Sequence, residues 1–338
     1  MKNRAFYILL FFSISLMACQ KDIQFDKVSV LERQLLVGDE AYIITGICYH
    51  PVPIGSSKRS FETIDKDLEL MVEAGINTIR VYEPIDDINV LDKIDAAGVK
   101  VIIGFGYDQK GFFDIKSGSF INYINTYKNH NAILMWELGN EYNYHPEWFD
   151  GEIKNWYNAM NDAADLIHEN DSNHPVTTAH GDLPNTLALS LSPNIDVWGM
   201  NVYRWTKPES IFIEWEAVSS KPMYLSEAGG DSYMTVSAEG YAQGENQKAQ
   251  ADANKIILEK SFDSKGICSG VAVFSFTDGW WKVGENDVQD IGGTAPNSSG
   301  VPFDRDPNEE FWGIVDIHRN KKKTFDVIKE VYQKQKID

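Results

Sequence analysis

The sequence has little positive charge and little cysteine. It has 31 Lys and Arg against 50 Asp and Glu, a formal charge of −19 over 338 residues. Such an acidic chain repels a phosphate backbone, so we expect no nucleic-acid partner. Three cysteines cannot build a disulfide framework, and no CxxC or HExxH pattern occurs. We therefore expect an enzyme or binding protein without a metal ion or cofactor.

Two of the cysteines, Cys48 and Cys268, lie in apolar stretches. We expect both to be buried free thiols, because cysteine behaves as a small hydrophobic residue in such surroundings. A disulfide between them is the alternative.

Long hydrophobic runs are also missing. The apolar run at residues 6–14 follows the basic Lys2 and Arg4 and is too short for a permanent membrane span. It ends in Leu-Met-Ala-Cys at 16–19, the pattern that precedes a bacterial lipoprotein cysteine. We expect residues 1–18 to be a cleaved signal peptide, with an ordinary secretory signal as the alternative.

Cys19 would then carry the lipid, including a fatty acid such as palmitate, and residues 19–33 would form a tether. Gln20 is not acidic, which in a cell with two membranes favours the outer membrane. The expected location is thus the outer membrane or cell surface of a bacterium. Removing 1–18 leaves 320 of the 338 residues, enough for one large domain.

Nothing of low complexity divides residues 34–338, and what recurs there is a helical pattern followed by a short apolar run. Gly75 ends the first such helix and Gly98 the second, and each glycine leads directly into a strand. Helix, glycine and strand in repeated succession are typical of parallel βα units.

Continuing this alternation gives eight strands and predicts a single-domain (β/α)8 TIM barrel. The predicted strands are residues 42–48, 78–82, 101–105, 133–138, 176–179, 197–201, 223–226 and 270–276. The predicted helices are residues 61–74, 87–97, 119–128, 153–169, 183–189, 210–218, 238–262 and 324–335. A hairpin at 34–42 would close the barrel's N-terminal mouth. A doubly wound open sheet is the alternative, but eight uninterrupted alternations favour the closed barrel.

Polar residues gather just after the predicted strands, where TIM barrels hold their active sites. Two of them are glutamates. Glu141 follows strand four in Gly-Asn-Glu, and Glu227 follows strand seven in Ser-Glu-Ala-Gly-Gly. Glycosidic bond cleavage needs one carboxylic acid to protonate the leaving oxygen and one carboxylate on the other face of the sugar. Carboxyl groups at strands four and seven can approach to about 5 Å, the spacing of retaining enzymes.

These residues resemble clan A of the glycoside hydrolases, the TIM-barrel retaining β-glycosidases. In that clan the acid/base follows an asparagine at strand four and the nucleophile ends strand seven, which matches Asn140, Glu141 and Glu227. Arg80 matches the strand-two arginine that contacts the nucleophile, and Tyr203 matches the strand-six tyrosine. Residues 46–51 and 75–82 also resemble the barrel of family 2 enzymes, and of β-1,3-glucan-active hydrolases and glucanosyltransferases.

The resemblance implies a role for each of these residues. Asn140 would bind the substrate 2-hydroxyl, Arg80 would keep Glu227 ionised, and Tyr203 would orient it. Burial against Trp136 or Trp205, and the charge of Glu227, would raise the pKa of Glu141. Glu137, on the same strand as Glu141, is interpreted as structural.

Further substrate contacts are expected from aromatic and imidazole side chains near strand ends. These candidates are His50, His180, Trp205, Trp280 and Trp281. The clan often has a tryptophan directly after strand eight, whereas here Phe276-Thr277-Asp278-Gly279 intervenes before the tryptophans. The acidic segment 285–290, with Asp304 and Asp306, is interpreted as a solvated lid rather than as a Ca²⁺ site.

The sequence therefore predicts a retaining β-glycoside hydrolase that acts by double displacement on extracellular polysaccharide or oligosaccharide, with β-glucan as the first expected substrate. It would be held at the membrane by its lipid. The alternatives are a β-glucan transglycosylase and a non-catalytic glycan-binding surface lipoprotein. Two opposed glutamates count against the last, since binding alone needs aromatic and amide groups.

Overall fold

The computed structural model describes residues 26–264, 266–293 and 300–335 of the chain. The predicted signal peptide 1–18 and the lipidation site Cys19 lie outside the described residues. Among the described helices, none has the length and hydropathy that spanning a membrane requires.

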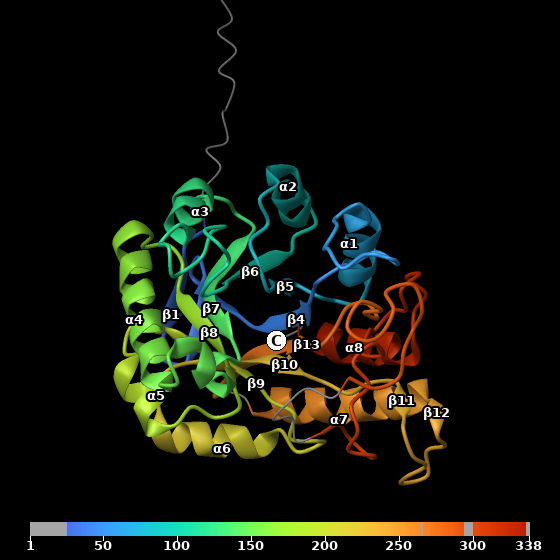
Figure 1. The fold of residues 1–338 in the computed structure, drawn as a ribbon. Coiled ribbons are helices and arrows are strands. Elements are labelled where there is room, and N and C mark those ends of the chain that lie inside the picture. The colour runs from blue at the N-terminus through green and yellow to red at the C-terminus, as the bar shows by residue number, and fades with distance from the viewer. Residues whose placement is uncertain (1–25, 265, 294–299, 336–338) are drawn as a thin grey trace, which may run out of the picture.

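A closed barrel of eight parallel strands forms the centre of the molecule, and helices surround it (Figure 1). Around the barrel the strands follow the order β10-β13-β4-β5-β6-β7-β8-β9. Their bounds are β4 Ile44–Cys48, β5 Thr78–Val81, β6 Lys100–Phe105, β7 Ile133–Asn140, β8 Val176–Gly181, β9 Val197–Asn201, β10 Met223–Ala228 and β13 Cys268–Val273. The predicted TIM barrel is confirmed, and the open sheet is excluded because β13 pairs with both β10 and β4.

Helices follow the strands as the hydrophobic periodicity predicts. They are α1 Ile64–Glu73, α2 Ile88–Ala96, α3 Phe120–Tyr127, α4 Ile153–Asn170, α5 Thr186–Leu191, α6 Glu209–Val218, α7 Gln247–Asp263 and α8 Lys323–Lys334. Two short 3-10 helices, η1 Tyr142–Tyr144 and η2 Pro146–Phe149, lie between β7 and α4. Gly75 and Gly98 end α1 and α2 with φ of 80° and 70°, a conformation that costs glycine little.

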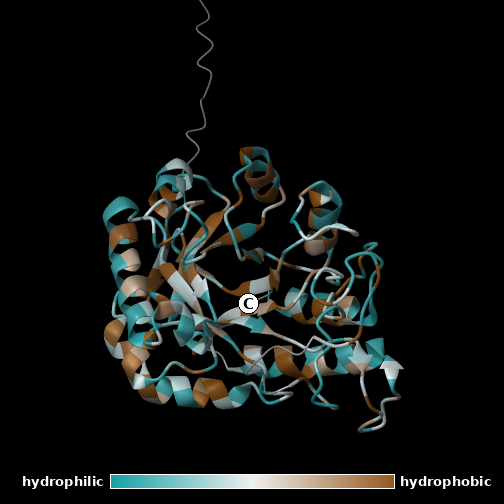
Figure 2. Ribbon diagram, in the orientation of Figure 1, coloured by the Kyte–Doolittle hydropathy of each residue, from teal (hydrophilic) through white to brown (hydrophobic). Residues whose placement is uncertain are grey.

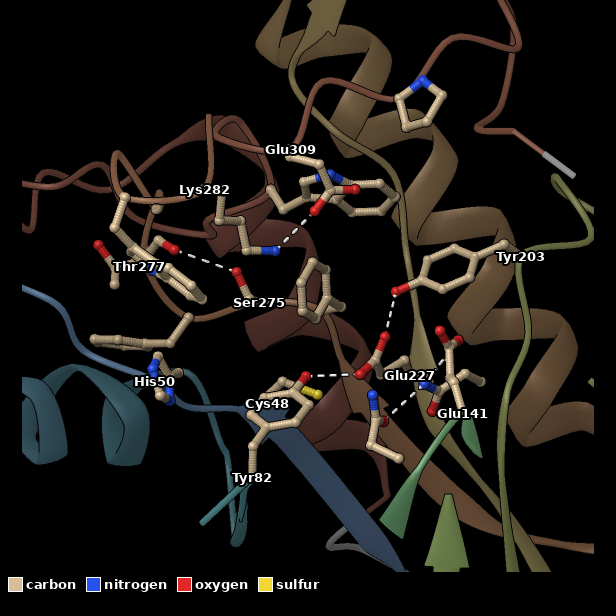
Figure 3. Close-up of a pocket in the computed structure, with 18 of the residues that line it drawn as sticks. Cys48, His50, Tyr82, Glu141, Tyr203, Glu227, Ser275, Thr277, Lys282 and Glu309 are labelled. Carbon is tan, nitrogen blue, oxygen red and sulfur yellow. Dashed lines mark hydrogen bonds and ion pairs between the residues drawn. The ribbon is translucent and has the colours of Figure 1, made fainter. Parts of the chain in front are cut away.

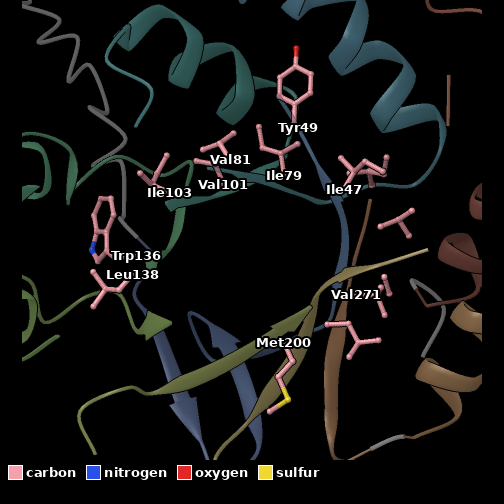
Figure 4. Close-up of a cluster of buried hydrophobic side chains, with 14 of the residues drawn as sticks. Ile47, Tyr49, Ile79, Val81, Val101, Ile103, Trp136, Leu138, Met200 and Val271 are labelled. Carbon is pink, nitrogen blue, oxygen red and sulfur yellow. The ribbon is translucent and has the colours of Figure 1, made fainter. Parts of the chain in front are cut away.

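Alternate residues of each strand belong to two different cores. One residue set faces the helices, as Figure 4 shows for Ile79, Val81, Val101 and Ile103, and is fully buried. Figure 2 shows hydrophobic and hydrophilic segments interspersed along the strands and helices. The other set fills the barrel interior, and at the N-terminal end of the strands it is apolar.

The chain before the barrel forms a three-stranded antiparallel sheet: β1 Val28–Leu31, β2 Gln34–Val37 and β3 Glu40–Tyr42. The predicted hairpin is its β2–β3 part, in which Leu35 pairs with Tyr42. Val28 and Leu35 pack against residues of the barrel interior, so the sheet closes the N-terminal end of the barrel.

Several predicted boundaries differ from the structure, and three of them have a clear physical reason. Strand β1 falls within residues 19–33, predicted as tether, because buried Val28 pairs with Val37. The helix predicted from residue 238 begins at Gln247, because Gly240 and Gly244 take φ of 90° and 100°. The eighth strand ends at Val273 rather than at residue 276, because the next residues exchange backbone hydrogen bonds with the segment 312–315.

Both described cysteines are free thiols, so the alternative of a disulfide between Cys48 and Cys268 is excluded.

Candidate active site

A cavity of about 450 Å³ opens at the C-terminal ends of the barrel strands (Figure 3). Strand ends supply one wall, which we call the strand wall: Cys48, Tyr82, Asn140, Glu141, Asn201, Tyr203 and Glu227. The loop between β13 and α8, residues 274–322, supplies the opposite wall, which we call the loop wall: Phe274, Ser275, Phe276, Thr277, Gly279, Trp281, Lys282, Pro307, Glu309 and Trp312. Both predicted glutamates therefore lie in one cavity.

Three donors hold the carboxylate of Glu227, which ends β10. Arg80 Nη1 lies 2.8 Å and Tyr82 Oη 2.7 Å from Oε1, while Tyr203 Oη lies 2.8 Å from Oε2. Burial and the negative charge of Glu227 raise the pKa of Tyr203 well above its usual range, so the phenol remains a donor. These three hydrogen bonds fix the orientation of the Glu227 carboxyl group, as an attacking nucleophile requires.

Arg80 lies at the centre of the strand wall and is completely buried. Besides Glu227 it donates to both oxygens of Glu137, at 2.7 and 2.8 Å, and to Asn140 Oδ1 at 2.8 Å. Tyr224 Oη donates to the same Glu137 carboxylate at 3.1 Å. The Glu137 carboxylate thus holds the Arg80 guanidinium, and Arg80 in turn orients Glu227. This arrangement agrees with a structural role for Glu137.

Glu141 follows β7 in a left-handed conformation with φ of 54°. Burial, and then the negative charge of Glu227, raise the pKa of its carboxyl to about 7. Asn201 Nδ2 donates to Glu141 Oε1 at 3.0 Å and opposes this shift. A carboxyl that holds its proton near neutral pH can act as a general acid.

The environment of Glu141 differs in one respect from the prediction. Trp136 faces the helices, where its ring packs on Phe105 and its Nε1 donates to Asp171. The guanidinium of Arg305 lies 4.5 Å from the ring centroid of Trp205. Neither tryptophan is among the described residues that line the cavity, so other residues bury Glu141.

Asn140 lies between Arg80 and Asn201, and both donate to its Oδ1, at 2.8 and 3.1 Å. These two bonds fix the amide, so that Nδ2 is the atom left to donate to a substrate hydroxyl. The geometry fits the predicted contact with the sugar.

His50 and Trp281 line the cavity as predicted, with ring centroids 5.1 Å apart. Three other candidates are placed elsewhere in the described structure. His180 Nδ1 donates to the carbonyl of Asp182 at 2.9 Å, and its Nε2 lies 3.2 Å from Tyr157 Oη. Trp280 packs edge-on against His318, and the Arg305 guanidinium lies over the Trp205 ring. None of these three side chains is among the described residues that line the cavity.

Sequence reasoning missed several lining residues. Tyr82 directly follows β5, and Asn201 is the last residue of β9. Their position at the end of an apolar run was an available signal. Phe274 is the aromatic residue directly after the eighth strand, which was overlooked because that strand was predicted to run on. Lys282, Glu309 and Trp312 come from the long loop, and nothing in the sequence places them.

No group of three or more His, Cys, Asp or Glu suited to a metal ion occurs within residues 26–264, 266–293 and 300–335. Residues 285–290 fold by hydrogen bonding to their own loop, for example Asp290 N to Glu310 Oε2 at 2.6 Å.

No protein-family model matches the sequence, and no curated protein matches it either. Solved structures do match the fold. A GH2 β-galacturonidase from Eisenbergiella tayi is 23% identical with a TM-score of 0.67 over 92% of this chain. A β-glucuronidase from Faecalibacterium prausnitzii is 18% identical with a TM-score of 0.68 over 91%. A β-glucuronidase from Bacteroides uniformis is 19% identical, also with a TM-score of 0.68, over 89%.

This chain spans 54%, 52% and 36% of the length of those three proteins, respectively. The likeness is one of fold, and at that level it confirms the resemblance to the TIM barrels of clan A glycoside hydrolases.

Proposed function

We propose that the protein is a β-glycoside hydrolase that works by double displacement, with Glu227 as nucleophile and Glu141 as acid/base. One observation carries the proposal: two glutamates line one cavity in different environments. Arg80, Tyr82 and Tyr203 all donate to Glu227, whereas burial and the charge of Glu227 raise the pKa of Glu141 to about 7. The structures that share the fold are glycoside hydrolases by description, which supports the same activity.

In the first step a Glu227 oxygen attacks the anomeric carbon, the glycosidic C–O bond breaks, and the Glu141 proton passes to the leaving oxygen. A covalent glycosyl-enzyme ester results. In the second step Glu141, now a carboxylate, takes a proton from water while the water oxygen attacks the anomeric carbon. The ester bond breaks, and Glu227 returns to its carboxylate with its three donors in place. Two displacements retain the β configuration.

The substrate we propose is extracellular β-linked polysaccharide or oligosaccharide, with β-glucan first. Replacing the two glutamates separates this mechanism from simple binding. Glu227→Ala removes the nucleophile, so turnover should fall by several orders of magnitude on every substrate. Glu141→Ala should still form the glycosyl-enzyme from a dinitrophenyl β-glycoside, whose leaving group needs little protonation.

The azide products are the diagnostic measurement. Azide should intercept the intermediate of Glu141→Ala as the β-azide, and should rescue Glu227→Ala as the α-azide from the vacated face. NMR of the products distinguishes the two. Near-normal turnover by both variants would contradict the assignment and favour a non-catalytic glycan-binding protein.

We also propose that the mature protein is anchored at the cell surface through lipid on Cys19, on the strength of the Leu-Met-Ala-Cys sequence. Cys19→Ser should abolish partitioning into the detergent phase and leave activity unchanged, because the lipid contributes an anchor and no part of the fold. Equal partitioning of the two proteins would contradict the anchor.

A further inference from the structure

The loop wall brings one positive charge to the cavity. Of the described residues that line it, Lys282 is the one with an ammonium or guanidinium group. Its Nζ lies 2.9 Å from Glu309 Oε2, and Glu309 lines the same cavity (Figure 3). Each side chain is 19% exposed, so water screens the pair only in part. The Lys282 Nζ also lies 4.1 Å from the ring centroid of Phe274, which lines the same cavity.

The loop holds both partners in place. Glu310, which is fully buried, accepts from the backbone N of Val283 at 3.0 Å and of Asp290 at 2.6 Å. These bonds tie the segment that carries Lys282 to the residue that follows Glu309. The backbone N of Glu309 donates to the carbonyl of Gly292 at 2.9 Å. The ion pair is therefore part of the loop's own structure.

Two residues that line the cavity carry neutral hydrogen-bonding groups without a partner in the described structure. Trp312 Nε1 and His50 Nδ1 are buried and have no partner among the described residues. Burial, and then the charges of Arg59 and Lys282, lower the pKa of His50 to about 4, so it is uncharged at neutral pH. A sugar hydroxyl can pair with such groups, whereas a carboxylate needs a cation to offset its loss of hydration.

We propose that Glu309 determines specificity by occupying Lys282, so that the site accepts neutral β-linked sugars and discriminates against uronic acid glycosides. The inference rests on the proposed hydrolase function and names its substrate class. A uronate carboxylate would have to share Lys282 with Glu309, which places two anions beside one cation and is unfavourable. The fold does not decide this point, since the similar structures named above are described as uronidases.

Matched aryl β-glycosides that differ only at C6 test the proposal. Nitrophenyl glucoside is compared with glucuronide, and galactoside with galacturonide, by kcat/KM. In the pair that the wild type cleaves faster, its kcat/KM for the neutral glycoside should exceed that for the uronide by about 100-fold or more. Glu309→Gln frees Lys282 and should raise the uronide-to-neutral ratio of kcat/KM roughly tenfold. A further Lys282→Met change in that background should remove the gain.

Glu285→Gln is the matched control, because it removes the same charge from an exposed position of the same loop that does not line the cavity. Its uronide-to-neutral ratio should equal that of the wild type. A wild type that prefers uronides, or a ratio unchanged in Glu309→Gln, would overturn the inference.

If no glycoside is cleaved, the hydrolase proposal fails, and saturation-transfer NMR with the corresponding methyl glycosides still decides the specificity. Neutral-selective binding that Glu309→Gln relaxes would support the role of Glu309. Unselective or uronide-selective binding by the wild type would refute it.

Discussion

The strand wall and the loop wall face the same cavity but are stabilised in different ways. In the strand wall, side chains bind side chains: Arg80 joins Glu137, Asn140 and Glu227 in one buried set of hydrogen bonds. In the loop that carries the loop wall, buried side chains bind backbone as well as side chains. Glu310 accepts from two backbone amides, and Lys322 donates to the Phe311 carbonyl as well as to Asp278.

The two walls therefore have different functions. The side-chain network of the strand wall orients Glu227, and the pKa of Glu141 is raised beside it, so a change there should alter chemistry. The loop wall shapes the space around the sugar, so a change there should alter affinity, specificity or stability.

Removing a buried cation from each wall gives the strongest contrast. Arg80→Met leaves Glu137 and Glu227 without their shared partner, and turnover should fall by about 10² to 10³. The free energy of unfolding should also fall, by about 3–5 kcal/mol. Steady-state kinetics and urea denaturation measure the two effects.

Lys322→Met is the matched change in the loop that carries the loop wall. The Lys322 Nζ lies 2.6 Å from Asp278 Oδ1, and both side chains are 3% exposed. It should cost a similar amount of stability, about 3 kcal/mol, while the folded protein keeps turnover within about tenfold. Equal loss of turnover in the two variants would break the distinction between the walls.

Two adjacent tryptophans of the loop, Trp280 and Trp281, are expected to differ in function. Trp281 lines the cavity beside His50, whereas Trp280 packs against His318. Trp281→Ala should raise KM by up to about tenfold through the lost aromatic contact. Trp280→Ala should leave KM unchanged and lower the free energy of unfolding by about 2–3 kcal/mol. The reverse pattern would show that Trp280 is the sugar platform.

The smallest effect concerns how the strand wall sets the pKa of Glu141. Since Glu141 must be protonated to act as acid, kcat/KM should fall as pH rises through about 7. Glu227→Gln removes the second cause of the shift, so the pKa of Glu141 should decrease. It should stay above the ordinary carboxyl range, because burial is the larger cause. Carbon-13 NMR titration measures it, and an unchanged pKa would show that the two carboxyls do not interact.

The strand wall was largely predictable from sequence and the loop wall was not. Glu141 and Glu227 each end an apolar run, and eight such runs fix which ends meet at one mouth. Lys282, Glu309 and Trp312 lie in a loop without periodicity, whose path depends on tertiary contacts such as Asp278 with Lys322. Trp205 and His180 show the limit of the strand-end rule, since position near a strand end does not fix where a side chain points.

The position of the N-terminal sheet determines which end of the barrel an N-terminal anchor would hold. Strands β1, β2 and β3 pack on the floor of the barrel, at the opposite end from Glu141 and Glu227. The chain that leads to Cys19 therefore joins the domain at the floor. An anchor at Cys19 would turn the floor toward the lipid and the mouth toward the medium, where long glycan chains could enter without approaching the bilayer.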